Sequence, residues 1–421
     1  MIVTIITYTS IYLGIVATTF YILSFLINKD NKKPLFTDKE LPFLTIIIPA
    51  YNEEKSIKRT IETALASDYP KNKFEIIVVD DGSKDNTLKI ARSMQNKFVK
   101  VFTKVNGGKA SALNLAISKA RGEVIITMDA DTFIEKNSAI EMIRYFKDRE
   151  VMSVTPSIIL HEPKGILQRV QQMEYVLGIF LRKVFASLNS IHVTPGAFSA
   201  YRKSFFDKYG GYIGMESGNL TEDLEMALRI QSHGYKIENS VNSAVYTVAP
   251  NKFKALTVQR RRWYMGLLKN MWTYKRLFGP KYGDLGMVLL PLAWISIFFS
   301  VFALFYLGYS IVAQGLQEFA LLNSVNFDLS YRYGLLFNPA MWQEVTSRNL
   351  FVIFSRPQII FLVFFVFLTA FYLIYASKKI GRIKGAWLSL PLFYIFFAVF
   401  FAFWWAVSIV YSIFNIKGKW R

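Results

Sequence analysis

The chain has 421 residues, of which 50 are Lys or Arg and 30 are Asp or Glu, so its formal net charge is +20. Hydrophobic residues make up 52% of the chain and charged residues only 19%, below the ~25% that is usual in soluble domains. This composition excludes a disordered chain and argues against an entirely soluble enzyme. Because the sequence contains no Cys, it also excludes a disulfide-stapled module, a thiol nucleophile and a cysteine-ligated metal.

Four uncharged segments are long enough to cross a bilayer, which takes about 20 mostly apolar residues. They are residues 2–27, 285–313, 359–376 and 386–414. A signal peptide is the alternative for the first segment, but that segment lacks a basic start and its apolar part is too long. We therefore predict a multi-pass membrane protein, with a transmembrane helix in residues 1–28 and two more in residues 358–416.

Basic residues beside these segments predict their orientation, because Lys and Arg gather on the cytoplasmic side of membrane spans. Three basic residues follow the first segment and four lie between the last two: Lys29, Lys32, Lys33, Lys378, Lys379, Arg382 and Lys384. This pattern places the N-terminus outside and residues 34–280 in the cytoplasm. The basic tail, residues 417–421, would then lie outside. Either the last segment is not a simple span, or residues 314–357 form a re-entrant loop instead of an extracytoplasmic one.

Residues 34–250 have the pattern of a cytoplasmic α/β domain. Short β-branched runs, typical of buried parallel strands, alternate with stretches of helical periodicity. The expected strands are 44–49, 75–80, 99–104 and 123–128, and the expected helices are 54–67, 85–97 and 109–120. This alternation predicts a doubly wound sheet, and such sheets bind ligands beyond the carboxyl ends of their strands.

Polar residues follow three of the expected strands. They are Tyr51-Asn52-Glu53, Asp80-Asp81-Gly82-Ser83 and Asp129-Ala130-Asp131. The Asp129 and Asp131 carboxylates suit Mg²⁺ or Mn²⁺, which take one or two carboxylates together with substrate phosphates, although the same spacing also occurs in a solvated turn. Gly107-Gly108-Lys109 opens a helix, where an anion can bind, but it is also a common helix entry and lacks the P-loop spacing.

Two further motifs occur in the second half of this region. Thr221-Glu222-Asp223 precedes an amphipathic helix, so Asp223 is either a helix-capping residue or a general base for a hydroxyl. Gln259-Arg260-Arg261-Arg262-Trp263 lies in residues 251–280, which read as a basic interfacial helix. Residues 165–191 and 253–278 are both expected to be amphipathic helices on the cytoplasmic surface of the membrane. In the alternative interpretation of the Gln259–Trp263 motif, Arg262 pairs with a phosphate and Trp263 stacks on a sugar ring.

Together these motifs resemble those of the processive, membrane-embedded group of glycosyltransferase family 2, which includes cellulose, chitin, hyaluronan and poly-N-acetylglucosamine synthases. The ordered set is Pro49-Ala50-Tyr51-Asn52-Glu53, Asp80-Asp81-Gly82-Ser83, Gly107-Gly108-Lys109, Asp129-x-Asp131, Gly196-Ala197-Phe198, Thr221-Glu222-Asp223 and Gln259-x-x-Arg262-Trp263. The resemblance covers roughly residues 40–280 and implies a GT-A type nucleotide-sugar domain between transmembrane helices. It also implies inverting transfer from a nucleotide sugar, usually UDP-linked GlcNAc or glucose.

The resemblance assigns roles on the donor side of the reaction. By analogy, Tyr51, Glu53 and Asp81 hold the nucleoside. Asp129 and Asp131 hold the metal, Mg²⁺ or Mn²⁺, and Asp129 also meets the pyrophosphate. Lys109 and Arg262 neutralise charge on the leaving UDP.

On the acceptor side, the resemblance implies that Asp223 takes the proton from the acceptor hydroxyl as that hydroxyl attacks the anomeric carbon. Trp263 stacks on the acceptor sugar, and Glu222 and Gln259 also contact it. Gly196, Ala197 and Phe198 line its path.

Several functions compete with a secreted β-linked polysaccharide as the product. A non-processive enzyme would put one sugar on a lipid acceptor with a similar site. The net charge of +20 could serve nucleic-acid binding, but the basic residues lie beside the membrane segments and no nucleic-acid module is present. A transporter without chemistry would not explain Asp129, Asp131 and Asp223. If four spans leave a polymer channel incomplete, an accessory membrane subunit or a homo-oligomer would complete it.

Overall fold

The computed structural model describes residues 2–27, 35–214, 218–324, 326–327, 357–380, 389–414 and 416. Several predictions fall outside these ranges. They concern the basic residues Lys29, Lys32, Lys33, Arg382 and Lys384, most of the loop at 314–357, and the tail at 417–421.

An eight-stranded sheet forms the centre of the molecule, with strand order β3-β2-β1-β4-β7-β6-β8-β5. The strands are β1 (Leu44–Ala50), β2 (Phe74–Asp80), β3 (Val99–Thr103), β4 (Val124–Met128), β5 (Phe133–Ile134), β6 (Val151–Leu160), β7 (Phe198–Arg202) and β8 (Lys236–Thr247). Strands β1 to β4 pair in parallel, whereas β7 pairs antiparallel with both β4 and β6. Strand β8 is parallel to β6, and β5 is antiparallel to β8.

Helices cover both faces of the sheet because the parallel strands are apolar on both sides. Ile46 and Ile48 of β1 belong to one core and Ile47 to the other. The first core is closed by α2 (Ile57–Leu65), α3 (Thr87–Ser93) and α5 (Ser138–Ile143). The second is closed by α4 (Lys109–Lys119), α7 (Lys203–Tyr209) and α8 (Glu222–Ser232). The predicted doubly wound α/β domain is therefore confirmed for its parallel half.

Strands β5 to β8 were not predicted, and their sequences explain why. Strand β6 contains Pro156, and β8 buries Asn239, Ser240 and Ser243, so neither shows a plain apolar run. Several of their polar groups are hydrogen-bonded: Asn239 Nδ2 donates to Thr155 Oγ1 of the neighbouring strand at 3.1 Å, and Ser243 Oγ donates to Ser138 O at 2.9 Å. Polar side chains that pair inside a sheet weaken the apolar pattern on which strand prediction depends.

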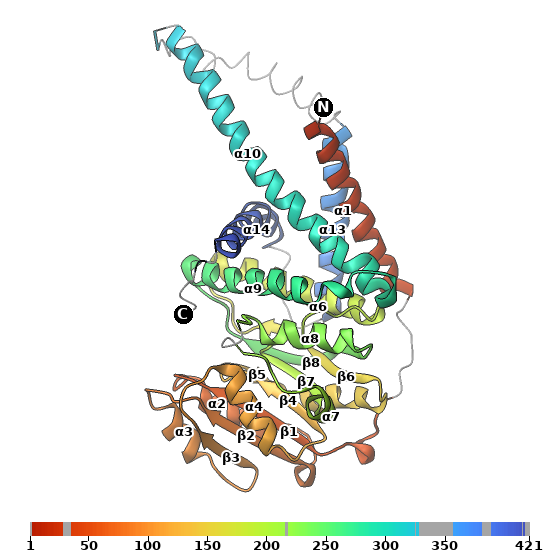
Figure 1. Cartoon of the computed structure of the whole chain (residues 1–421), viewed down its shortest axis with the longest axis vertical. Coiled ribbons are helices and arrows are strands. Elements are labelled where there is room, and N and C mark those ends of the chain that lie inside the picture. Colours follow the sequence, from red (N-terminus) through yellow and green to blue (C-terminus); the bar gives the residue numbers. More distant parts are fainter. Residues whose placement is uncertain are drawn as a thin grey trace.

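Two long helices, α6 (Gly165–Ser187) and α9 (Phe253–Thr273), lie between the sheet and the apolar helices (Figure 1). They begin where the sequence predicted amphipathic helices and end a few residues earlier. The remaining short helices are η1 (Asp38–Glu40), η2 (Lys71–Lys73), η3 (Arg144–Lys147), η5 (Lys275–Leu277), η6 (Pro280–Tyr282) and the π-helical turn η7 (Leu285–Leu289).

The apolar helices are α1 (Ile2–Ile27), α10 (Leu290–Ser324), α13 (Pro357–Ile380) and α14 (Leu390–Ile413). Within the described residues, three helical segments are long and apolar enough to cross a membrane: Ile5–Ser24, Leu285–Ser324 and Leu390–Ile413. The fourth predicted span corresponds to α13, whose apolar part, Ile359–Tyr375, is shorter. Helix α10 continues past residue 313, where the sequence predicted a loop.

Helix α14 packs directly on α9 and thus connects the apolar helices to the sheet domain (Figure 1). The ring of Tyr264 in α9 stacks on that of Trp405 in α14, with a centroid distance of 4.3 Å. Trp404 Nε1 also donates a hydrogen bond to Thr257 Oγ1 at 3.2 Å. Aromatic stacking of this kind joins the two helices over several turns.

Candidate active site

The polar motifs after β1, β2 and β4 meet at one edge of the sheet, as the sequence predicted. The parallel register pairs Ala50 with Asp80, so the residues that follow these strands are neighbours. Asp81 N donates to Ala50 O at 2.9 Å, and Asn52 N donates to Ser83 Oγ at 2.9 Å. Tyr51 is half-buried beside them.

Asp81 is buried, and its carboxylate organises the loop that leads into α4. It accepts hydrogen bonds from Gly107 N at 3.0 Å and Gly108 N at 2.8 Å. Lys104 Nζ also pairs with Asp81 Oδ1 at 2.9 Å. Two backbone N–H groups and one ammonium therefore hold the turn immediately before Lys109.

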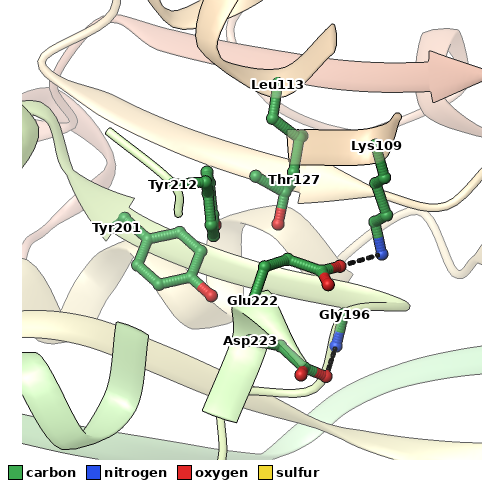
Figure 2. A pocket seen from close by; sticks show the side chains of 8 residues that line it. All are labelled: Lys109, Leu113, Thr127, Gly196, Tyr201, Tyr212, Glu222 and Asp223. Carbon is green, nitrogen blue, oxygen red and sulfur yellow. Dashed lines mark hydrogen bonds and ion pairs between the residues drawn. The ribbon is translucent and has the colours of Figure 1, made fainter. Parts of the chain in front are cut away.

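Lys109 is the centre of charge in the site. Its Nζ lies 3.1 Å from Glu222 Oε1, at the start of α8 (Figure 2). The same Nζ lies 2.7 Å from Asp129 Oδ1, after β4. Burial alone would lower the pKa of Lys109, but Asp129, Glu222 and Asp223 raise it well above its ordinary value. For Glu222 the directions are reversed: burial alone would raise its pKa, but the positive charges of Lys109 and Arg262 lower it below the ordinary value. Lys109 is therefore a permanent cation that bridges the sheet edge and α8.

Asp131 lies in an environment rich in negative charge. Burial, Asp129 and Glu53 raise the pKa of Asp131 to about 6, against the opposing effect of Lys109. The Glu53 carboxylate accepts a hydrogen bond from Ser56 Oγ at 2.8 Å. No group of three or more His, Cys, Asp or Glu side chains suited to a metal occurs in the described part of the chain. The donor set at Asp129 and Asp131 fits a divalent cation that completes its shell with water and phosphate oxygens.

Asp223 lies at the first turn of α8, where both of its carboxylate oxygens accept backbone hydrogen bonds. Gly196 N donates to Oδ2 at 3.1 Å (Figure 2), and Leu224 N donates to Oδ1 at 2.8 Å. Burial and Glu222 raise the pKa of Asp223 to about 6, although Lys109 and the two N–H groups oppose this shift. A carboxylate with this pKa is ionised near neutral pH and can still accept a proton, as a general base must.

The segment Gly196-Ala197-Phe198 lies between Asp129 and Asp223 and is hydrogen-bonded to both. A Cβ at Gly196 would lie 2.9 Å from Lys109 Nζ and 3.3 Å from Asp223 Oδ2, so any larger residue here would displace the Lys109 ammonium or the Asp223 carboxylate. Ala197 O accepts a hydrogen bond from Asp129 N at 3.0 Å. Phe198 is buried at the start of β7, where it anchors the segment to the sheet.

Helix α9 carries the Gln-x-x-Arg-Trp motif, and its residues have different environments. The positive charge of Arg262 helps Lys109 to lower the pKa of Glu222. Gln259 Oε1 is buried and has no hydrogen-bond partner among the described residues. The guanidinium of buried Arg260 pairs with Glu174 of α6 at 2.5 Å and lies over the ring of Trp263, 4.4 Å from its centroid. Arg260 thus supports the Trp263 ring from one face.

Comparisons with known proteins identify the family. The sequence model described as glycosyl transferase family 2 matches residues 45–210. The chain is 30% identical over 308 residues to the poly-beta-1,6-N-acetyl-D-glucosamine synthase of Staphylococcus aureus (strain COL), a match that covers 71% of this chain and 72% of that protein. The chain belongs to glycosyltransferase family 2. The predicted family and the predicted enzyme class, a glycosyltransferase, are thus confirmed.

A second relative and one solved structure are also similar to this chain. The poly-beta-1,6-N-acetyl-D-glucosamine synthase of Staphylococcus epidermidis is 30% identical over 238 residues, covering 55% of this chain and 57% of that protein. Among solved structures, the mannosyltransferase PcManGT from Pyrobaculum calidifontis, in complex with GDP-Man and Mn²⁺, matches with a TM-score of 0.53 at 19% identity. That match covers 89% of this chain and 99% of the other and supports the GT-A-like fold alone.

Sequence reasoning missed several residues that shape the site of this family 2 glycosyltransferase. Leu113, Thr127, Tyr201 and Tyr212 line the pocket around Lys109, Gly196, Glu222 and Asp223 (Figure 2). Thr194 Oγ1 donates to Asp223 O at 2.7 Å and accepts from Tyr201 OH at 2.9 Å. Thr194 could have been predicted as a site residue because it lies directly before Pro195-Gly196. Nothing in the sequence pattern identified Tyr201 and Tyr212 as site residues.

Proposed function

We propose that this glycosyltransferase moves a sugar from a nucleotide donor, UDP-linked GlcNAc or glucose, to the growing end of a β-linked polysaccharide at the cytoplasmic membrane. The transfer inverts the anomeric centre, and the product is secreted. The observation that carries the proposal is that Lys109 and Asp223 line the same pocket, with Lys109 Nζ and Asp223 Oδ2 at 2.9 and 3.3 Å from the position that a Cβ on Gly196 would occupy. A cation for a leaving phosphate and a base for a hydroxyl therefore border one pocket, as sugar transfer requires. The name of the Staphylococcus aureus relative supports the choice of sugar and of a polymeric product.

In this proposal, the two charged groups act on opposite ends of the reaction. Asp223 accepts the proton from the acceptor hydroxyl while that oxygen attacks the anomeric carbon and the bond to UDP breaks. Lys109 and Arg262 stabilise the negative charge that develops on the departing diphosphate. The hydrogen bonds from Gly196 and Leu224 hold the Asp223 carboxylate in place before the substrate arrives.

The remaining site residues are assigned to the two substrates. Tyr51, Glu53 and Asp81 bind the nucleoside part of the donor, and Asp129 meets its pyrophosphate.

On the acceptor side, Trp263 stacks on the acceptor sugar, with Gln259 and Glu222 beside it, and Gly196, Ala197 and Phe198 line the path of the chain. The unpartnered Gln259 Oε1 supports this assignment, because a sugar hydroxyl would satisfy it.

Asp129 and Asp131 are proposed to hold a divalent cation, Mg²⁺ or Mn²⁺, that accompanies the donor. When bound, such an ion neutralises diphosphate charge and so makes UDP a better leaving group. The Pyrobaculum calidifontis mannosyltransferase, which shares the fold, was solved with Mn²⁺.

The proposed membrane placement rests on the three long apolar helices and on the basic residues in the sequence beside them. A cysteine introduced at Ser324, the end of α10, should react with an impermeant thiol reagent added outside the cell. A cysteine at Ser377 in α13 should not react, because the proposal places it at the cytoplasmic side. The natural chain contains no Cys that could interfere. Labelling at residue 377 but not at 324 would reverse the proposed topology.

The function itself is tested by incubating the full-length protein in membranes with UDP-GlcNAc or UDP-glucose and measuring released UDP. The product is then sized and digested with glycosidases of known linkage. A long, lipid-free polymer supports the proposal, and a single sugar on a lipid would establish the non-processive alternative. The Asp223→Asn protein is the control for UDP released by other membrane enzymes.

A further inference from the structure

The hydroxyl of Thr221, the N-cap residue of α8, is engaged outside the helix. Threonine at an N-cap usually accepts a hydrogen bond from an N–H of the first turn. Within the described part of the chain, the Thr221 side chain makes no such bond. Instead, Asn270 Nδ2 of α9 donates to Thr221 Oγ1 at 3.1 Å and to Asn219 Oδ1 at 3.1 Å. The residue two positions before Asp223 is thus held by the neighbouring helix.

Asn219 completes this arrangement. Its Oδ1 also accepts a hydrogen bond from Thr221 N at 3.3 Å, so Asn270 ties together the two residues that lead into α8. Asn219, Thr221 and Asn270 are 7%, 6% and 3% exposed. Water cannot readily replace buried hydrogen bonds of this kind, and their loss leaves unsatisfied polar atoms.

Gly266, one turn before Asn270 on α9, brings the two helices into close contact. A Cβ at this position would lie 2.3 Å from Thr221 Oγ1 and 2.5 Å from Thr221 Cγ2, well inside van der Waals contact. Only glycine therefore allows α9 to approach the N-terminus of α8 this closely. The contact and the hydrogen bond from Asn270 fix the same residue from the same side.

The sheet holds Asp223 from the opposite side. Thr194 Oγ1 donates to Asp223 O, and Tyr201 OH of β7 donates in turn to Thr194 Oγ1. Both Thr194 and Tyr201 are buried. The start of α8 is consequently held between the sheet, which contacts Asp223, and α9, which contacts Thr221. The Asp223 carboxylate accepts the hydrogen bond from Gly196 N in this arrangement.

We propose that Asn270 and Gly266 are positioning residues for Asp223, so that helix α9, through Thr221, sets the alignment of the base toward the acceptor hydroxyl. This inference rests on the proposed role of Asp223 as the base. Helix α9 also carries Arg262 and Trp263 and packs on α14 through Tyr264. One helix would therefore hold the acceptor and align the base, and the membrane helices would act on both together.

Asn270→Ala tests the proposal, and Asn239→Ala is its matched control. Both asparagines are almost fully buried, and each donates from Nδ2 to a Thr Oγ1 at 3.1 Å, but Asn239 lies between β8 and β6. With UDP-GlcNAc as donor, kcat of Asn270→Ala should fall about tenfold or more, because small displacements of catalytic groups have large effects. The Kd for UDP should stay within about twofold, and Asn239→Ala should change kcat by less than about twofold. An unchanged kcat, or equal losses of kcat and UDP binding, would overturn the proposal.

Two further variants keep the proposal testable if Asn270→Ala fails to fold. Thr221→Val preserves the side-chain shape but removes the acceptor oxygen. Gly266→Ala adds the clashing Cβ, whereas Gly308→Ala, in α10, adds a Cβ that meets no atom within 4 Å. Both Thr221→Val and Gly266→Ala should lower kcat by about fivefold or more and leave UDP binding unchanged, with Gly308→Ala silent. Normal turnover in both would overturn the proposal.

Asp223→Asn, measured in the same assay, distinguishes a failure of the proposed mechanism from a failure of the positioning role of α9. If it retains turnover, Asp223 is not the base, and both the proposed mechanism and this inference fall. If it loses turnover while Asn270→Ala, Thr221→Val and Gly266→Ala all keep theirs, the mechanism stands and only the positioning role of α9 is wrong.

Discussion

The two sides of the site are built in different ways. The donor side, which we define as Asp81, Lys109, Asp129 and Asp131, follows parallel strands within one stretch of the chain. The acceptor side, defined as Gly196, Asp223, Trp263 and Asn270, comes from a loop, a helix start and a helix that packs on α14. Strand register aligns the first group, whereas contacts between helices distant in sequence align the second.

This difference indicates which part of the site can respond to the membrane. The donor side is tied to the sheet through the backbone hydrogen bond from Asp81 N to Ala50 O and through the loop held by Asp81. The acceptor side depends on α9, which is joined to α14 by Tyr264 and Thr257. Substitutions in the apolar helices should therefore affect the alignment of the acceptor more strongly than the binding of the donor.

The largest effect is expected from the loss of the donor-side carboxylate Asp131. Asp131→Asn keeps the shape of the side chain but removes a charged oxygen ligand, so transfer should fall to background. Chelation with EDTA should do the same, and Mg²⁺ or Mn²⁺ should restore it. The stimulation of UDP binding by Mn²⁺ provides a readout that does not depend on turnover. Full activity in EDTA would remove the metal from the donor side.

On the acceptor side, Asp223→Asn should lower turnover by about 10²-fold or more, the range expected for the loss of a general base. Asparagine caps a helix about as well as aspartate, so a residue that served only as a cap would tolerate the change. The Kd for UDP should be retained, unlike the effect expected from a donor-side variant. Turnover and UDP affinity measured together distinguish the base, the cap and a donor-binding residue.

The pH dependence of kcat should report Asp223 with a smaller effect, together with Asp131, whose pKa is also raised to about 6. The pKa of Asp223 is raised to about 6, with Glu222, Lys109 and Arg262 as the charged neighbours of this cluster. Below this pH the base is protonated, so kcat should fall about tenfold per unit as the pH decreases and level off above 6. A profile at saturating UDP-GlcNAc checks this, and a flat profile between pH 5 and 7 would contradict it. The shift also makes the ionised carboxylate unfavourable in the folded protein at neutral pH, so Asp223→Asn should not lower the melting temperature.

The smallest effect on the site is expected from a substitution at the end of the donor-side strands that lies away from the site. Glu75 in β2 is buried, and its carboxylate accepts hydrogen bonds from Thr45 Oγ1, Lys100 Nζ, and Arg121 N and Nε at 2.9–3.0 Å. Burial alone would raise the pKa of Glu75, but these donors together lower it. Glu75→Gln should reduce the free energy of unfolding by about 1–3 kcal/mol, allowing for the exposure of the two cations, and leave kcat of the folded protein unchanged.

The sign of this stability effect follows from the lowered pKa. Glu75 contributes stability above its unfolded pKa, near the ordinary value of 4.5, and loses it as the pH falls through the lower folded value. The difference between the natural protein and Glu75→Gln should therefore shrink as the pH falls below 4.5. Thermal melting in detergent measures it. Glu62→Gln, which removes an exposed pair with Lys58, is the control and should change little.

The same contrast explains how much could be predicted from the sequence. Strands β1 to β4 and the motifs after them were predictable, because buried parallel strands have a strong apolar pattern and their polar ends share one edge. The assignment of Asp223 came from family resemblance, and its contacts with Gly196 and Thr194 were not foreseen. The pairing of Lys109 with both Asp129 and Glu222 joins positions far apart in the chain, and no local pattern encodes such a distance. Asn270 carries no sequence signal for the same reason.

The Asp81 carboxylate has a thermodynamic consequence for donor binding. It holds Gly107 and Gly108 by their N–H groups, and glycine loses more conformational entropy on ordering than any other residue. Fixing the backbone of one residue corresponds to about 1–2 kcal/mol at 25 °C. Because this turn is ordered when the chain folds, that entropy is lost before the nucleotide arrives. Donor affinity should therefore reflect contacts with a preformed loop, and binding should show little of the unfavourable entropy that accompanies loop closure.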